Sequence, residues 1–397
     1  MNVYLDNNAT SMTAPEVVEE MMPFFSQMYG NPSSIHHFGG QVGAHIAKAR
    51  EKVAALLGAR PDEIVFTGGG SESDNTAIRG ALEAMKGKKR HIMTTRVEHP
   101  AVRGVFHHLE KQGYRLSEIP VDRDGYLNLD YLENNLSPDT AIVSVMWANN
   151  ETGVIFPIEK IAKMVKAAGA VFHTDAVQAT GKLPIDMGRL PVDLLTISGH
   201  KLHAPKGVGA LYVRKGTKLT PLIIGGHQES GKRAGTENVP SIVGLGKAAE
   251  LAMRDMEEEN KRVRSLRDRL ERGLLDNCKG AVVNGKNRLP NTLNISFEYI
   301  EGESILLMLD ELGIAASSGS ACTSGALEPS HVLRAMGVPF TLAHGSIRFS
   351  LSRYNNEKEI DHVIDNMPAI VDRLLEISPF AEQNGGSFGG FKSACNV

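Results

Sequence analysis

The sequence predicts an α/β protein in which helices flank the mostly parallel sheet of a large domain and a smaller α+β domain follows. Short runs rich in β-branched residues alternate with helical patterns from about residue 45 to 215. These runs are apolar on both faces, as in parallel strands that helices cover on both sides. The pattern changes after residue 277, which indicates the second domain.

Six strands are expected in the large domain, each bounded by turn residues. They fall within residues 63–69, 91–99, 141–151, 170–178, 193–201 and 209–216, and helical stretches such as residues 158–169 lie between several of them. Ligands bind such sheets at the carboxyl ends of the strands. Polar residues follow several of these strands, so the sequence predicts a ligand site at that edge.

The second region begins after a long charged helix, or helix pair, at residues 240–277. Apolar strands at 291–297 and 346–352 surround a helix at 303–313, and a final helix covers 357–378. The apolar residues of this last helix recur at helical spacing, which predicts one packed face: Ile360, Val363, Ile364, Met367, Ile370, Val371 and Leu374. The Gly-rich residues after 379 have no period and are expected to be mobile.

Charge and composition argue against several function classes. The net charge of -3 removes the electrostatic reason to expect nucleic acid or an anionic membrane as a partner. No apolar stretch approaches the length of a membrane span, and the N-terminus does not read as a signal peptide, so we expect a cytosolic protein. The three cysteines are too scattered for a disulfide framework or a zinc site.

A glycine-rich turn within residues 64–78 (IVFTGGGSESDNTAI) is the first candidate ligand site. Gly70 and Ser71 stand where a strand gives way to a helix, and glycines with a helix N-terminus favour a phosphate. The segment has neither the GK[ST] of a P-loop nor the GxGxxG of a dinucleotide site. An ordinary helix N-cap after a tight turn explains it about equally well.

Two further segments place reactive side chains at strand ends. Asp175 and Gln178 follow one strand, and Lys201 follows the next, just after Ser198 and His200. Taken alone, each is best explained as a loop aspartate or a solvated lysine. Together with the phosphate turn they match pyridoxal phosphate, whose aldehyde needs a lysine, whose ring nitrogen needs an acid and whose phosphate needs hydrogen-bond donors.

Cys322 lies in the segment SSGSACTSG, residues 317–325, among small residues. A buried cysteine that acts as a small hydrophobe is the usual alternative for an intracellular thiol. The near absence of apolar neighbours disfavours it here and indicates a reactive thiol on a loop that Gly319 and Gly325 allow to move. Cys278 and Cys395 are expected to have no role in the chemistry.

These motifs, together with LDNNATS, NPSSIHHFG, VEHPAV, NNETG, RAGTEN and IRFSLSRYN, resemble those of cysteine desulfurases of the NifS and IscS type, and most closely the NifS branch. The resemblance runs from residue 2 to about 378. It implies fold type I of the pyridoxal phosphate enzymes, with a seven-stranded sheet. It also implies a large domain at residues 15–255, a small domain at 1–14 and 256–378 that carries the loop 317–325, and a tail at 379–397.

The resemblance implies three catalytic residues. Lys201 would form the Schiff base and carry protons, and His99 would stack on the cofactor ring and exchange protons. Cys322 would be the nucleophile, with His99 as the leading candidate to accept its proton. No metal is required, although Cys322 could ligate a nascent Fe–S cluster shared with a scaffold.

The binding residues follow from the same resemblance. Asp175 would hold the pyridinium proton and Gln178 the ring hydroxyl. The phosphate would be bound by Gly70, Ser71, Ser198 and His200, with Thr236 supplied by the partner subunit of a homodimer. Asn150 and Arg348 would hold the substrate carboxylate, the guanidinium as a bidentate fork.

The activity implied is conversion of L-cysteine to L-alanine, with sulfur held as a persulfide on Cys322 and passed to a scaffold of the NifU or IscU type or to another acceptor. Transamination and selenocysteine lyase activity remain alternatives among enzymes of this fold, and a sulfur or cluster carrier is an alternative without catalysis. Transamination has no use for Cys322, and a carrier would not bind pyridoxal phosphate.

Overall fold

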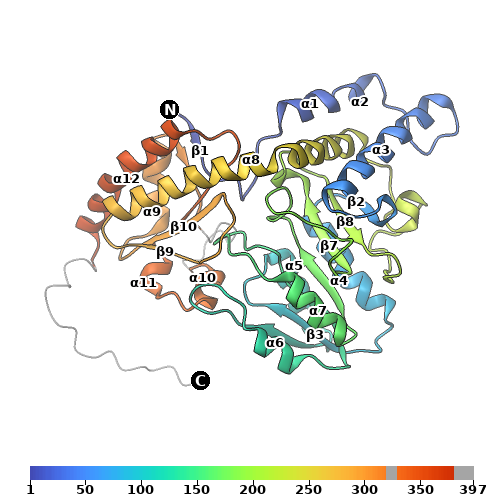
Figure 1. The fold of residues 1–397 in the computed structure, drawn as a ribbon, viewed down its shortest axis with the longest axis horizontal. Coiled ribbons are helices and arrows are strands. Elements are labelled where there is room, and N and C mark those ends of the chain that lie inside the picture. The colour runs from blue at the N-terminus through green and yellow to red at the C-terminus, as the bar shows by residue number, and fades with distance from the viewer. Residues whose placement is uncertain (319–328, 380–397) are drawn as a thin grey trace.

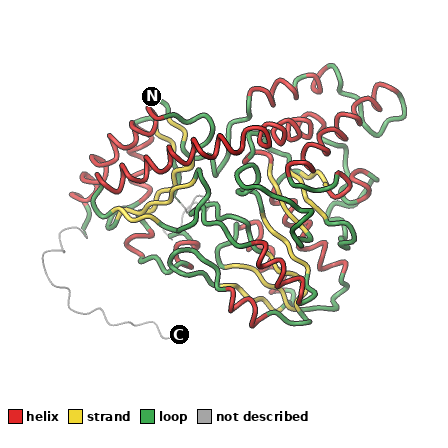
Figure 2. Tube along the Cα trace, viewed as in Figure 1, coloured by secondary structure: helices red, strands yellow, loops and turns green. Residues whose placement is uncertain are grey.

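A computed structural model describes residues 1–318 and 329–379 of the chain. Its main feature is a seven-stranded sheet with strand order β2-β8-β7-β6-β5-β3-β4 (Figures 1 and 2). The neighbours β7-β6-β5-β3-β4 are parallel, and β8 runs antiparallel to both β2 and β7. The predicted mostly parallel α/β sheet is therefore confirmed. Its strands are β2 (Ile64–Thr67), β3 (His91–Thr95), β4 (Arg115–Ile119), β5 (Thr140–Ser144), β6 (Val171–Asp175), β7 (Leu194–Ser198) and β8 (Gly209–Val213).

Helices cover both faces of this sheet, and separate apolar cores lie on its two sides. Five strands, β2, β3, β5, β7 and β8, are buried along their whole length, as expected for a covered sheet. The helices of this region are α1 (Pro15–Met21), α2 (Pro23–Ser26), α3 (His37–Leu56), α4 (Gly70–Ala84), α5 (Pro100–Lys111), α6 (Leu129–Asn135) and α7 (Ile158–Ala167). Short 3-10 turns are η1 (Pro61–Glu63), η2 (Gly199–Lys201) and η3 (Gln228–Gly231).

The second region contains a three-stranded antiparallel sheet, β12-β10-β9, and a parallel pair, β1-β11. The pair joins the N-terminus to the C-terminal part of the chain. The strands are β1 (Val3–Tyr4), β9 (Ala281–Val283), β10 (Thr292–Phe297), β11 (Ile314–Ala315) and β12 (Ser346–Ser350). The helices are α9 (Gly302–Glu311), α10 (His331–Ala335), α11 (Phe340–Ala343) and α12 (Glu357–Ile377).

One continuous helix, α8 (Val239–Asn277), links the two regions (Figure 1). Its first half packs its buried residues into the core beside the large sheet, and its second half contributes Val263, Leu266, Leu270 and Leu274 to the second core. The sequence predicts a helix or a helix pair here, and the structure contains a single helix. The predicted boundary between residues 255 and 256 falls inside this helix, and the division into domains stays a prediction.

Candidate active site

The sheet order brings the predicted residues to one edge. Strands β7, β6, β5 and β3 are neighbours, and their carboxyl ends meet there. His99 follows β3, Asn150 follows β5, Asp175 ends β6 and Ser198 ends β7. Residues that are far apart in the sequence therefore come together because parallel strands share a direction.

Lys201 lies in η2, directly after β7, and its ammonium points at the N-terminal segment. Its Nζ donates to the carbonyl oxygens of Asn8 and Ala9, both at 2.5 Å. Gln178 donates from Nε2 to the same Asn8 carbonyl at 3.0 Å. The pKa of Lys201 is lowered to about 8, mainly by burial and in addition by the positive charge of Arg348.

The two residues predicted to hold the substrate carboxylate, Asn150 and Arg348, both contact Asn8 or its partner carbonyl. Nδ2 of Asn8 donates to the carbonyl oxygen of Asn150 at 3.1 Å, and Nη1 of Arg348 donates to the same oxygen, also at 3.1 Å. Arg348 lies in β12, and its Nη2 donates to Asp6 at 2.7 Å. Its Nε is buried and has no hydrogen-bond partner in the described part of the chain. This arginine therefore retains a donor for a bound anion.

Asp175 is 6% exposed, and its Oδ1 accepts the amide of Val177 at 2.9 Å. Burial raises the pKa of Asp175 to about 6, while the Val177 amide and the Lys201 ammonium pull it downwards. A buried carboxyl group of this kind is stabilised in its charged form by a cation or a protonated ring nitrogen.

His99 is the N-cap of α5, and its Nδ1 accepts the amide of Ala101 at 3.1 Å. Burial lowers the pKa of His99 to about 4, and the charge of Lys201 acts in the same direction. The ring is therefore neutral near pH 7. Because Nδ1 is an acceptor, the proton of the neutral ring sits on Nε2, and His99 can donate there.

The phosphate turn has the expected form. Gly69 takes φ 148°, which favours glycine, and α4 begins at the next residue. A Cβ atom at Gly70 would lie 3.4 Å from Cβ of Ser198, so the turn adjoins the end of β7. Ser71 lies in the first turn of α4, where amide groups lack intrahelical acceptors. Nδ1 of His200 lies 3.2 Å from the hydroxyl oxygen of Thr10.

One predicted residue, Thr236, is not brought into this cluster, and another, Cys322, is not among the described residues. Thr236 is exposed, and nearby Arg233 pairs with Glu72 of α4, Nε to Oε1, at 3.0 Å. Cys322 lies outside the described residues, as do the cysteine loop from residue 319 and Cys395. Within residues 1–318 and 329–379 no group of His, Cys, Asp or Glu is arranged to hold a metal ion.

The residues present fit pyridoxal phosphate. Gln178 has a buried Oε1 with no hydrogen-bond partner among the described residues, which is the acceptor that a ring hydroxyl needs. A buried acid, a lysine with a lowered pKa and a glycine-lined helix start surround the same edge. These are the acid, amine and phosphate donors that the cofactor requires.

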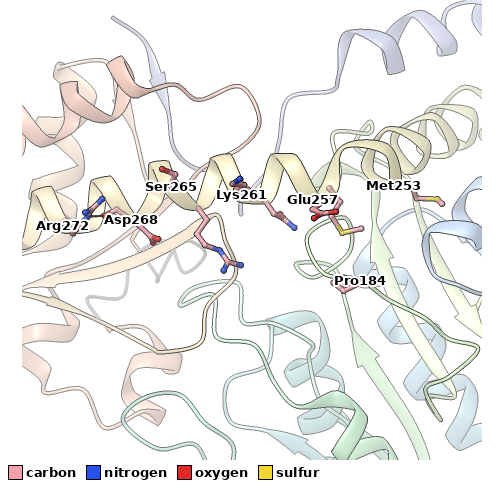
Figure 3. A pocket seen from close by; sticks show the side chains of 10 residues that line it. Pro184, Met253, Glu257, Lys261, Ser265, Asp268 and Arg272 are labelled. Carbon is pink, nitrogen blue, oxygen red and sulfur yellow. Dashed lines mark hydrogen bonds between the residues drawn. The ribbon is translucent and has the colours of Figure 1, made fainter.

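A groove of about 820 Å³ lies along α8 (Figure 3). Methionines and charged side chains line it, among them Met253, Glu257, Lys261, Asp268 and Arg272. None of its lining residues belongs to the predicted site. In the part of the chain that the structure describes, no helix has the length and apolar character needed to cross a membrane.

The interpretation of the sequence missed the roles of Asn8 and Asp6. Asn8 is 2% exposed and joins Lys201, Gln178 and Asn150, while Asp6 pairs with Arg348. The available signal was the polar run DNNAT directly after apolar Leu5. A polar run near a terminus is usually solvated, and only the pairing of β1 with β11 brings it inside.

Comparison with known proteins gives consistent results. The family model of the class V aminotransferases matches residues 3–363. A cysteine desulfurase of Trichormus azollae is 61% identical over 386 residues, which cover 97% of this chain and 96% of that protein. The cysteine desulfurase NifS of Azotobacter vinelandii is 57% identical, with 97% and 96% covered. The solved structure of a NifS-like protein superposes with a TM-score of 0.89 at 42% identity and covers 94% of this chain and 100% of that one.

Proposed function

Because the chain belongs to the class V aminotransferase family and is a pyridoxal-phosphate-dependent cysteine desulfurase, we propose that it transfers the sulfur of L-cysteine to Cys322 and releases L-alanine. The observation that carries the assignment of residues is the convergence on Asn8. Lys201 and Gln178 bind its carbonyl, and Asn150 binds its side chain.

Bound pyridoxal phosphate supplies an electron sink that acidifies the substrate Cα–H and makes the sulfur electrophilic. Asp175 holds the ring-nitrogen proton, because its buried carboxylate has little other compensation for its charge. Lys201, with a pKa of about 8, is able to gain and lose a proton near neutral pH. The amine therefore serves as both the cofactor anchor and the proton carrier.

Arg348 orients the substrate through its carboxylate. Asp6 and the Asn150 carbonyl already fix the two terminal nitrogens, so the guanidinium is held in place before substrate arrives. The buried Nε gains a partner when a carboxylate binds. Such preorganisation reduces the entropy lost on binding.

His99, neutral near pH 7, can donate a hydrogen bond from Nε2. That His99 accepts the proton of Cys322 stays a prediction, and it requires Nδ1 to release the Ala101 amide. Accepting a proton at Nδ1 would break the N-cap bond of α5. Once Cys322 has lost its proton, with His99 as the leading candidate to accept it, the thiolate attacks the substrate sulfur. A sulfur–sulfur bond forms while the carbon–sulfur bond breaks, and the electron pair of the broken bond stays with the carbon that is protonated to become the methyl group of alanine.

The protein works as a homodimer and hands its sulfur to a scaffold protein or another acceptor. Support for the dimer comes from exposed apolar side chains around α1 to α3, such as Phe25, Tyr29 and fully exposed Ile35. The exposed position of Thr236 is consistent with a role in the partner's phosphate site. The cytosolic location stays a prediction.

The test is incubation of the protein, loaded with pyridoxal phosphate, with L-cysteine and a reductant, measuring alanine and sulfide together. We expect equal amounts of both. Alanine without sulfide, or neither product, would contradict the proposed reaction. Release of a keto acid instead of alanine would indicate transamination.

Two variants separate the roles of the amine and the thiol. Lys201→Ala should lose the visible absorbance of the lysine-bound cofactor and lower sulfide formation by about 10³-fold or more. Cys322→Ala should keep that absorbance and still respond spectrally to L-cysteine, but form no sulfide. Lys163→Ala, at an exposed lysine of α7, is the control.

A further inference from the structure

The start of α10 is tied to the loop that carries Asn150. Ser330 is the N-cap of α10, and its Oγ accepts the amides of Val332 at 3.1 Å and Leu333 at 3.3 Å. The same hydroxyl donates its hydrogen to Oε2 of Glu151. Because a serine hydroxyl has one hydrogen and two lone pairs, these three bonds use its whole capacity.

Glu151 is a fixed group and not a mobile surface acid. It is 4% exposed, and its backbone amide donates to Oδ1 of Asn149 at 2.9 Å. Its carbonyl accepts Nδ2 of Asn294 from β10 at 3.3 Å. Burial raises the pKa of Glu151 to about 7, while the Ser330 hydroxyl and the Arg348 charge lower it. Among the described residues, Ser330 supplies the side-chain hydrogen bond of this carboxylate.

A second bond holds the same helix start on the opposite side of the site. His331 donates from Nε2 to the carbonyl of Glu98 at 3.0 Å, and Glu98 directly precedes His99. The first turn of α10 thus contacts both the Asn150 loop and the segment that carries His99. In the sequence, Ser330 follows Cys322 by eight positions.

We propose that Glu151 and Ser330 are positioning residues for the desulfurase reaction, which fix α10 against the substrate-carboxylate site. The inference rests on the proposed function. It assigns no contact with the substrate to either residue. Asn150 and Arg348 keep their own contacts, and Ser330 follows the nucleophile Cys322 by eight positions in the sequence. The effect should therefore fall on the sulfur-transfer step more than on amino-acid binding.

The test uses Ser330→Ala in the enzyme loaded with pyridoxal phosphate. The variant removes both cap bonds and leaves the buried Glu151 carboxylate without its donor. We expect kcat for sulfide formation to fall about tenfold or more, which corresponds to the loss of one buried hydrogen bond. The affinity for L-alanine, measured from the absorbance change on titration, should stay within about twofold, because Arg348 and Asn150 are untouched.

Further variants make the result specific. Ser330→Thr keeps the hydroxyl and should restore kcat to within about threefold. Glu151→Ala should also lower kcat. The double variant should be no worse than Ser330→Ala alone, because Ser330→Ala already removes the bond to Glu151 together with the two cap bonds. Hydrogen exchange at the amides of Val332 and Leu333 should be faster in Ser330→Ala.

The matched control is Asn128→Ala, which removes the N-cap of α6, where Asn128 accepts the Tyr131 amide at 2.8 Å. Its kcat should match that of the wild type. An unchanged kcat in Ser330→Ala, or failure of Ser330→Thr to restore it, would overturn the proposal. Failure of the wild type to form alanine and sulfide would instead refute the proposed function. The hydrogen-exchange comparison would still show whether Ser330 holds the start of α10.

Discussion

Lys201, Asp175 and His99 each titrate away from their ordinary pKa chiefly because burial disfavours the charged form. The pKa of Asp175 rises to about 6, and those of Lys201 and His99 fall to about 8 and about 4. Such shifts gather at sites where proton transfer is needed. Their common cause is the position of these residues at the covered edge of the sheet.

Glu98 lies beneath the same edge and offers a pH test of this burial. It is fully buried, and its Oε1 accepts from Thr95 and from the Met146 amide, both at 2.9 Å. Its Oε2 has no partner in the described part of the chain. Burial raises the pKa of Glu98 to about 8. The folded protein therefore holds a proton here that the unfolded chain loses near the ordinary value of 4.5.

Because the pKa of Glu98 is higher in the folded than in the unfolded chain, we predict that Glu98 contributes stability that is fully present below about pH 4.5 and is lost as the pH rises through about 8. Glu98→Gln imitates the protonated group and removes this loss. Between pH 5.5 and 8.5 the free energy of unfolding, from urea titration, should fall by about 3 kcal/mol less in Glu98→Gln than in the wild type. Glu133→Gln, at an exposed position of α6, should follow the wild type. Equal slopes for Glu98→Gln and the wild type would show that Glu98 is charged in the fold.

At the scale of elements, the long helices are placed by close packing more than by helix propensity. Gly273 of α8 faces α12, and a Cβ there would lie 2.6 Å from Cδ1 and 2.7 Å from Cγ1 of Ile364. The two helices share the second core at this point. The spacing of the apolar residues predicted the packed face of α12, and Ile364 lies at its half-buried margin.

Gly273→Ala is therefore expected to destabilise the protein by about 1 to 3 kcal/mol, although alanine is the better helix former. Gly104→Ala in α5 is the matched variant, because a Cβ there has no atom within 4 Å. It should stabilise the protein by about 0.5 to 1 kcal/mol. Thermal and urea unfolding of both variants check this. Stabilisation by Gly273→Ala would mean that α8 and α12 separate easily.

Strand β4 shows where element prediction from sequence is weakest. Its residues RLSEI have one β-branched member and are only partly buried up to Ile119. It lies at the edge of the sheet and pairs with β3 alone. Edge strands lack the apolar signal of central strands, so no separate run indicated this one. The expected count of seven strands came from the family resemblance.

For the whole molecule, the exposed apolar surface near α3 predicts how subunits meet. Ile35 is fully exposed and lies near exposed Phe25, Tyr29 and Phe38 in the sequence. Patches of this kind on soluble proteins mark interaction surfaces. We predict that Ile35→Asp weakens the dimer, which sedimentation at micromolar concentration would show as a growing monomer fraction.

The control for this prediction is Leu307→Asp on α9, since Leu307 is 70% exposed in the second region of the chain. Leu307→Asp should sediment as the wild type does. If Ile35→Asp remains dimeric while Leu307→Asp dissociates, the interface lies on the other region. Loss of activity in step with dissociation of Ile35→Asp would support a contribution of Thr236 to the partner's site.

The sequence by itself determined the alternation of strands and helices and the parallel sheet, and it singled out Lys201, Asp175 and Gln178 as candidate site residues, because period and residue type are local properties. Only the tertiary structure decided that Asn8 joins Lys201 and Gln178 and that Glu151 accepts the Ser330 hydroxyl. These contacts link positions up to 193 residues apart. Their partners are backbone carbonyls and buried acids, whose pairing depends on which strands lie side by side, and no local pattern encodes that.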